Sequence, residues 1–313
     1  MIVSELLSQE LYYNDKSFLY FANDTITTTA TGDTTPEYDN TVQYLHGDYV
    51  KVSSVKRKFR CANVSGFIGK HPIDYLGIDW TDAGAINEFA MFDDSLSSAT
   101  VSQNDFFTTM EIKGATTLTI QNLKNIANIR IVHKSADNSI IYSDTTYGRD
   151  IGRYSYYDYY TRPIKDIKKI TTFLEWHGVS NIEISFTVET GGTSEVGFFG
   201  CGVAYDLGAT LYGSSVGYED YSIYKTDEFG FTTFDKRVAV DIINGKVLID
   251  VKKTDYALDV LKSLRGKLSH FIGDEREKGE IKSLNIVGYV KNLTIPIDGP
   301  SKNEYPIKII GGA

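Results

Sequence analysis

A run of glycine and aromatic residues from Tyr205 to Arg237 restricts the folds open to this chain of 313 residues. The run contains four glycines, at Gly208, Gly213, Gly217 and Gly230, among tyrosines, phenylalanines and small polar residues. Glycine reaches positive φ at little cost, and aromatic side chains suit the half-buried face of a pleated sheet. The run therefore predicts short strands joined by tight turns.

Period-two alternation of apolar residues predicts further strands. These strands are expected at residues 117–123, 128–133, 139–144, 181–189, 235–251, 283–298 and 306–312. The strand at 235–251 is expected to bend at Asn244-Gly245, and the tyrosine-rich segment 153–164 is predicted to be a strand covered by another layer or subunit. Closely spaced strands with turns between them indicate a β-sandwich.

Two segments show helical spacing. Residues 254–272 repeat leucine at Leu258, Leu261, Leu264 and Leu268, with Thr254 or Asp255 as the N-cap. Near the N-terminus, Val3, Leu6, Leu7 and Leu11 form a short amphipathic pattern that predicts one helix. The threonine-rich stretch that follows is expected to be a linker or an exposed strand.

Composition excludes several classes of protein. The net charge of −9, from 32 basic and 41 acidic residues, gives no basic field for direct binding to nucleic acid. Cys61 and Cys201 stand far apart, so neither a disulfide framework nor a zinc cluster is expected, and both should be buried. The N-terminus lacks the features of a signal peptide, and no apolar run reaches the length of a membrane span. We therefore expect synthesis in the cytoplasm and no membrane span.

The sequence shows no pattern of a catalytic or metal site. Its five histidines have no metal-ligand spacing, and hydrolase or nucleotide-binding motifs are absent. The paired acids Asp93-Asp94, Glu219-Asp220 and Asp227-Glu228 are sequence neighbours, which point to opposite faces of a strand. No catalytic residue, metal ligand or cofactor is predicted, and the chain is not expected to be an enzyme.

Residues 37–80 resemble the small chitin-binding type of module of carbohydrate-binding families 5 and 12. The matching positions are Tyr38, Tyr44, Gly47, Asp48, Val50, Phe59, Gly69, Pro72 and Trp80. The resemblance implies a three-stranded module and glycan-binding rings at Tyr38, Tyr44, Tyr49, Phe59 and Trp80. However, Tyr38 replaces the tryptophan of the pattern and Phe59 replaces a tyrosine. These two departures favour a spacer, in which the rings are buried, over a glycan-binding module.

Three segments resemble structural proteins of tailed bacteriophages. They are the run at 205–237, the sequence W-T-D-A-G-A-I-N-E-F-A-M-F-D from Trp80 to Asp93, and the pair of motifs at 271–273 and 288–293. The resemblance implies a mainly β chain in four parts: an N-terminal segment (1–36), a carbohydrate-binding-module-like spacer (37–80), a β-sandwich of the galactose-binding-like jelly-roll type (81–203) and a C-terminal β-rich domain with one helix (204–313).

The same resemblance implies a structural part of the phage virion, in the tail or neck, at the tail tip, baseplate or collar. Its partners would be further copies of itself and other tail or neck proteins. The 22 tyrosines agree with extensive protein interfaces. The alternative is a receptor-binding tail protein, an adhesin that recognises a glycan on the host surface. A third hypothesis, a glycan-degrading enzyme, requires a pair of carboxylates in a groove.

Overall fold

The computed structural model describes residues 1–6, 11–13, 19–21, 26–30, 33–93, 95–150, 156–161, 165–274, 281–297 and 299–312. These residues form a mainly β structure of several antiparallel sheets, which confirms the predicted fold class. The chain divides into two compact units. We call residues 7–200 the central unit, and residues 1–6 with 201–313 the terminal unit.

A small three-stranded sheet lies in the first part of the central unit. Its strands pair antiparallel in the order β5 (Tyr49–Val52), β6 (Arg57–Cys61) and β7 (Trp80–Ala85), with the 3-10 turn η1 (Ser53–Val55) between the first two. Buried side chains include Tyr44, Phe59 and Trp80. The sheet matches the three-stranded module that the sequence predicts for this region.

A five-stranded antiparallel sheet follows in the central unit. Its order is β12 (Ile140–Tyr147), β11 (Ile126–Ser135), β16 (Val179–Val188), β9 (Phe106–Lys113) and β4 (Thr27–Thr28). Alternate residues of β16 are buried, namely Ile182, Ile184 and Phe186. Strand β4 takes up two residues of the threonine-rich stretch, for which the sequence predicts a linker or an exposed strand.

Further strands of the central unit bury a second apolar surface. They are β8 (Thr100–Ser102), β10 (Thr117–Lys124), β15 (Lys169–Phe173) and the first residues of β17 (Ser194–Asp206), and they bury Leu118, Ile120, Ile170, Val196 and Phe198. Two sheets that each bury one apolar face give the sandwich-like architecture that strand spacing predicts.

The tyrosine-rich segment corrects a prediction. Residues 156–161 form the helix α1 (Tyr156–Thr161) rather than a strand. Residues 151–155 and 162–164 lie outside the described part of the chain. The Thr161 hydroxyl donates to the Tyr157 carbonyl four residues back (2.8 Å), and the rings of Tyr156 and Tyr160 meet one turn apart, with centroids 5.1 Å apart. Tyrosines that stand four residues apart share one helix face, which a search for period two overlooks.

The remaining elements of the central unit are short. They are β2 (Leu11–Tyr13) paired with β3 (Leu19–Phe21), the 3-10 helix η2 (Asn87–Phe92), and β13 (Arg149–Asp150) paired with β14 (Lys165–Asp166).

The terminal unit is built around one antiparallel sheet. The last residues of β17 form one edge of this sheet. The strands that follow, in order, are β1 (Ile2–Leu6), β23 (Ser269–Ile272), β24 (Asn285–Leu293), β25 (Lys302–Gly311), β22 (Ala239–Asp250) and β18 (Ala209–Thr210). Strand β19 (Ser215–Asp220) also pairs with β22.

Two predictions for this unit are wrong. The first residues form β1, not a helix, because pairing with both β17 and β23 stabilises an extended Ile2-Val3 pair and buries Val3 completely. Strand β22 runs without a break through Asn244-Gly245. A Cβ on Gly245 would lie 3.0 Å from both Ile307 and the Met1 side chain, so the glycine allows close packing rather than a bend.

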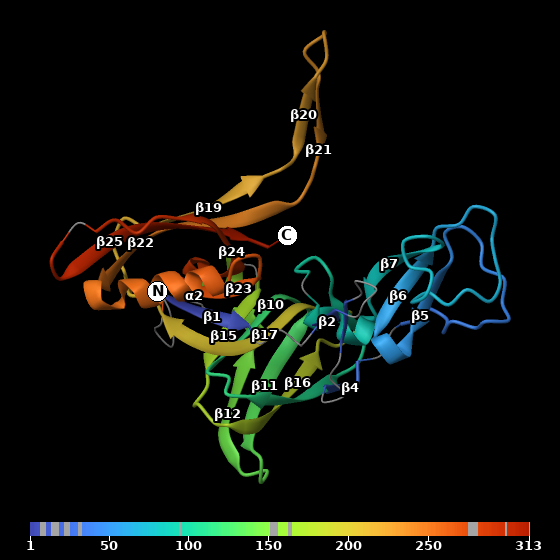
Figure 1. Cartoon of the computed structure of the whole chain (residues 1–313), viewed down its shortest axis with the longest axis horizontal. Coiled ribbons are helices and arrows are strands. Elements are labelled where there is room, and N and C mark those ends of the chain that lie inside the picture. The colour runs from blue at the N-terminus through green and yellow to red at the C-terminus, as the bar shows by residue number, and fades with distance from the viewer. Residues whose placement is uncertain are drawn as a thin grey trace. The chain divides into compact units, whose positions relative to one another are not determined.

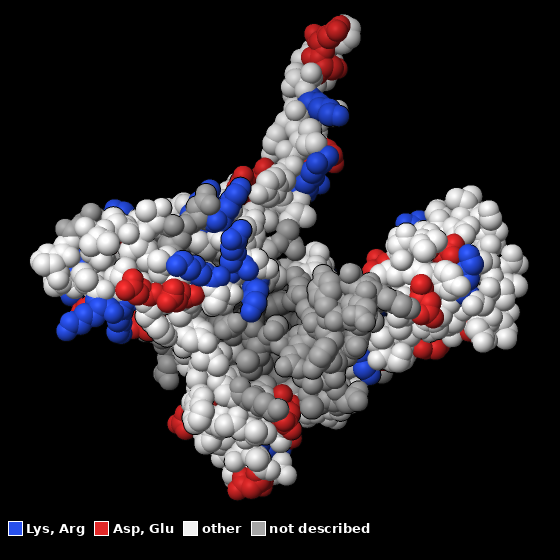
Figure 2. All heavy atoms as spheres, viewed as in Figure 1, with Lys and Arg blue, Asp and Glu red and all other residues white. Residues whose placement is uncertain are grey.

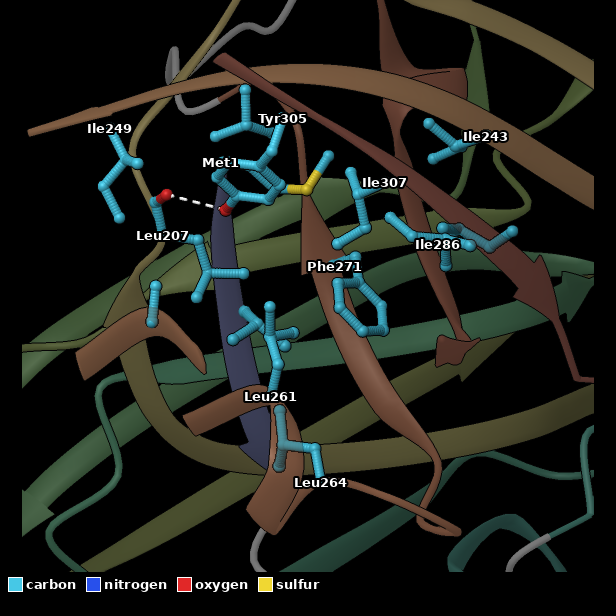
Figure 3. Packing of buried hydrophobic residues seen from close by; sticks show 14 residues of the cluster. Met1, Leu207, Ile243, Ile249, Leu261, Leu264, Phe271, Ile286, Tyr305 and Ile307 are labelled. Atoms are coloured by element: carbon cyan, nitrogen blue, oxygen red, sulfur yellow. Dashed lines mark hydrogen bonds between the residues drawn. The ribbon is translucent and has the colours of Figure 1, made fainter. Parts of the chain in front are cut away.

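Helix α2 (Thr254–Ser263) packs on the apolar core of the terminal unit (Figure 3). Leu261 and Leu264 are buried, but the helix ends at Ser263, and Gly266 at φ 76° precedes strand β23. The predicted helix to residue 272 is therefore too long. The N-cap differs as well, because Lys253 stands at the N-cap of α2 without a capping side chain. Asp250 caps the preceding 3-10 turn η3 (Val251–Lys253), where it accepts a hydrogen bond from the Lys252 amide. The last 3-10 turn is η4 (Lys282–Leu284).

Candidate functional site

The glycine-aromatic run forms a projecting β-arm. The hairpin of β19 and β22 continues beyond the sheet of the terminal unit as a two-stranded ribbon of β20 (Ile223–Thr226) and β21 (Thr232–Asp235) (Figure 1). Within the described residues, β20 and β21 pair only with each other. We call residues 212–238 the aromatic arm.

The aromatic arm exposes large side chains. Seven aromatic residues of the arm are between 50% and 104% exposed to solvent, namely Tyr212, Tyr218, Tyr221, Tyr224, Phe229, Phe231 and Phe234. Single exposed hydrophobic residues are normal on a protein surface, whereas seven exposed aromatic side chains on one projecting segment indicate an interaction site. The arm is therefore the strongest candidate site in the described part of the chain.

The two faces of the ribbon differ. Residues directly opposite in an antiparallel pair share one face, and Tyr224 pairs with Phe234 and Thr226 with Thr232. The rings of Tyr224 and Phe234 meet edge to face with centroids 5.4 Å apart, and the two threonine hydroxyls lie 3.0 Å apart. The opposite face carries Lys225, which is charged. One side of the ribbon therefore offers an aromatic surface for binding.

The tip of the arm is held in a fixed shape. The Asp227 carboxylate accepts hydrogen bonds from the amides of Phe229 (3.0 Å) and Phe231 (2.8 Å). The Gly230 amide donates to the Asp227 carbonyl (3.0 Å), and Gly230 has φ 85°, which favours glycine. The two phenylalanines are thus presented by an ordered turn, beside the acidic pair Asp227-Glu228 at the end of the arm (Figure 2).

Hydrogen bonds also order the arm where the ribbon leaves the sheet. Asp220 accepts from the Ser222 amide (2.9 Å) and from the Tyr224 hydroxyl (3.0 Å), and the Arg237 amide donates to the Ser222 hydroxyl (3.0 Å). Hydrogen bonds from Ser222 and Tyr224 lower the pKa of Asp220, and the bond to Asp220 raises the pKa of Tyr224. An ordered arm loses less conformational entropy when it binds.

Most of the predicted glycan-binding residues lie inside the three-stranded module. Tyr44, Phe59 and Trp80 are buried, and the Trp80 indole donates to the Lys70 carbonyl (2.9 Å). Tyr38 is half-buried and stacks on Tyr44, with centroids 5.5 Å apart. A sugar-stacking surface needs exposed ring faces, which this cluster lacks.

Tyr49 differs from the other four predicted residues because its side chain is 51% exposed. It pairs across β5 and β6 with Arg60, whose guanidinium lies 6.0 Å from the centre of the ring. A single ring that already has a cation beside one face offers little surface to a sugar chain.

The structure describes five of the six residues in the acidic pairs. Glu219 and Asp220 are exposed neighbours on β19, Asp227 is engaged in the turn at the arm tip, and Asp94 lies outside the described residues. In the described ranges, no group of three or more His, Cys, Asp or Glu side chains is placed to hold a metal ion.

Cys61 and Cys201 are both free and buried, as predicted. Burial raises the pKa of Cys201 to about 12.

An open depression of about 330 Å³ lies on the central unit. Its lining residues are Thr109, Met110, Glu111, Asn138, Asn181 and Glu183. The Glu183 carboxylate binds the Lys134 ammonium (2.6 Å), and the lining contains no aromatic ring. This depression therefore lacks a stacking surface for a sugar.

No helix in the described part of the chain has the length and apolarity of a membrane span.

No family model matches the chain, and the search of curated proteins found no match.

The aromatic arm was not among the sites predicted from the sequence. A signal for it was present, because residues 212–238 contain many aromatic residues but few aliphatic ones to build a core around them.

Proposed function

We propose that this protein is a structural, non-catalytic component of a tailed-phage virion, and that it assembles with copies of itself through the aromatic arm. Its place would be the tail or neck, together with other tail proteins. The observation that carries the proposal is the arm, an ordered ribbon whose aromatic face is covered by no described residue.

The size of the aromatic surface supports a protein interface. An aromatic side chain buries about 150–250 Å² when it is fully covered. With the exposed fractions of the seven arm residues, this gives roughly 1,000 Å² of aromatic surface. A standard interface buries about 800 Å² on each partner. The exposed aromatic surface of the arm, summed over its base, strands and tip, is therefore as large as the area that one side of a standard interface buries.

The virion setting rests on the resemblance of residues 80–93, 205–237, 271–273 and 288–293 to phage structural proteins. The adhesin alternative has less support, because three of its five proposed rings lie in the core of the module. Tyr49 is the ring through which a glycan would have to bind.

Mass spectrometry of purified and washed phage particles tests the virion setting. We expect this chain in a fixed copy number per particle, and labelled antibodies against it should mark the tail or neck in electron micrographs. Absence of the chain from washed particles would contradict the proposal.

A further inference from the structure

The connection between β15 and β16 covers a buried imidazole in the central unit. His133 of β11 is completely buried, and its Nε2 lies 2.8 Å from the hydroxyl of Ser180, near the start of β16. The ring of His177, in the connection, meets the His133 ring edge to face, with centroids 5.8 Å apart. In the described part of the chain, Nδ1 of His133 has no hydrogen-bond partner. His133 is therefore an imidazole with one satisfied nitrogen, enclosed in part by this connection.

Backbone hydrogen bonds fix the two ends of the connection but not its middle. The Leu174 amide donates to the Thr116 carbonyl (2.8 Å). The Gly114 amide donates to the Gly178 carbonyl (2.9 Å). Among the described residues, no backbone hydrogen bond involves residues 175–177, which we call the flap. The anchored ends allow the flap to move while the strands on either side stay in place.

Ring contacts hold the flap in its closed position. The Trp176 indole is 67% exposed, and a Cβ on Gly114 would lie 3.2 Å from its Nε1, so one edge of the indole lies against Gly114. Gly114 has φ 72°, which favours glycine. The other contact is that of His177 on His133. Each pair of atoms in such contacts contributes little, so a small change in free energy is enough to open the flap.

The charged groups near His133 are few. Opposite residues in paired strands share one face, so Tyr142 of β12 stands beside His133, and Asp144 follows two residues later on that face. Strands β16 and β9 add the uncharged side chains Ser180, Ile182, Met110 and Ile112. The buried side chains of β8, β10, β15 and β17 are uncharged as well. The flap brings Glu175 and His177. Burial lowers the pKa of His133, the charge of His177 lowers it further, and the Glu175 carboxylate acts in the opposite direction.

We propose that the flap is an acid-sensitive switch, closed at neutral pH and displaced from His133 when this imidazole becomes protonated. An imidazolium has two N–H donors, and the closed structure provides an oxygen for one of them, from Ser180. A buried cation without its partners is strongly unfavourable. Displacement of the flap admits water to Nδ1, whereas strand ladders hold β11 between β12 and β16. The switch is independent of the proposed self-assembly.

The direction of the switch follows from proton binding. The open form binds a proton on His133 more readily than the closed form, so the closed form is favoured above about pH 6.5, the ordinary pKa of histidine. As the pH falls toward the lower pKa of the closed form, the ratio of open to closed molecules should rise by up to about tenfold for each pH unit.

Protection of a thiol placed beneath the flap tests the switch in the full chain. In a Ser180→Cys variant, the introduced thiol should react with dithiodipyridine, a disulfide reagent that is effective in acid, only when the flap is open. The rate is divided by that of the urea-unfolded chain at the same pH, between about pH 7.5 and 5. We expect this normalised rate to rise toward low pH, while Cys61 and Cys201, which are buried elsewhere, stay protected. A normalised rate that is independent of pH would overturn the inference, as would loss of amide protection in β11 and β16 over the same range.

Substitutions in this background assign the proton. His133→Gln should abolish the rise, and His177→Gln should move it to higher pH, because the charge of His177 opposes protonation of His133. His46→Gln, on an exposed loop, is the matched control and should leave the curve unchanged. A rise that persists in His133→Gln would overturn the inference. If His133→Gln fails to fold, His177→Gln decides, and a curve that is lost, unmoved or moved to lower pH would overturn the inference.

Discussion

The Tyr305 hydroxyl donates a 2.9 Å hydrogen bond to the Leu207 carbonyl inside the core of the terminal unit (Figure 3). Both residues are completely buried. The bond joins β25 to the segment that follows β17, and burial raises the pKa of Tyr305 well above its ordinary value.

Tyr305→Phe removes this bond and leaves the Leu207 carbonyl buried without its partner. We expect a loss of about 1–3 kcal/mol in the free energy of unfolding, measured by chemical denaturation. Tyr256→Phe is the control, because the exposed Tyr256 on α2 is expected to give no measurable loss. Equal stability of the two variants would show that the buried bond contributes nothing.

The packing of α2 gives a second prediction. Leu261 is buried against the sheet of the terminal unit, so Leu261→Ala should cost about 2–5 kcal/mol through lost contacts and a residual cavity. Leu261→Asp should prevent this unit from folding. Unchanged thermal unfolding of Leu261→Asp would refute this packing, and Asp259→Ala on the exposed side of the helix serves as the control.

A buried histidine makes the stability of the central unit dependent on pH. His133 is completely buried, its Nε2 lies 2.8 Å from the Ser180 hydroxyl, and its Nδ1 has no hydrogen-bond partner. Burial lowers the pKa of His133, His177 lowers it further, and Glu175 partly opposes the shift. The unfolded chain therefore binds a proton more readily than the folded chain.

Stability should accordingly be highest above about pH 6.5, the ordinary pKa of histidine, and should fall as the pH decreases toward the lower pKa of the folded state. The measurement is the midpoint of urea unfolding between about pH 7.5 and 5. His133→Gln should reduce the dependence on pH, and His46→Gln, on an exposed loop, should not. A pH dependence identical in His133→Gln and the unsubstituted chain would contradict this assignment.

A measurement of glycan binding distinguishes the hypothesis of a spacer module from that of an adhesin. Because Tyr44, Phe59 and Trp80 are buried, we expect no saturable binding of chitin oligosaccharides by the full chain, even at millimolar concentration. Tyr49→Ala is the informative variant, since Tyr44→Ala would damage the module core. A dissociation constant below about 1 mM, near −4 kcal/mol, that Tyr49→Ala abolishes without unfolding would favour the adhesin.

Strand alternation predicted much of the fold. The segments 117–123 and 128–133 each lie within a strand, and 181–189 does so up to Val188, because one buried face leaves a period of two in the sequence. Two strands at the edges of helical patterns were missed. The first residues were assigned to a helix, and β23 was assigned to the end of α2, because pairing with distant strands decides their conformation.

The aromatic arm shows why the candidate site was harder to predict. Alternation and glycines indicated its strands and turns, and Gly213 and Gly230 both adopt positive φ. The sequence around an aromatic residue such as Tyr224 looks the same in a buried strand and in a solvent-exposed two-stranded ribbon. Only the absence of a covering layer distinguishes the two, and that depends on residues far away in the sequence.

The oligomeric state of the full chain tests the central claim most directly. Sedimentation velocity should show a defined oligomer for the unsubstituted chain and a folded monomer for the Phe229→Ser, Phe231→Ser double variant. A matched Thr226→Ser, Thr233→Ser variant, also on the arm, should retain the oligomer. Assembly that is unaffected by loss of both phenylalanines, with unchanged thermal unfolding, would contradict the assignment of the arm as the assembly interface.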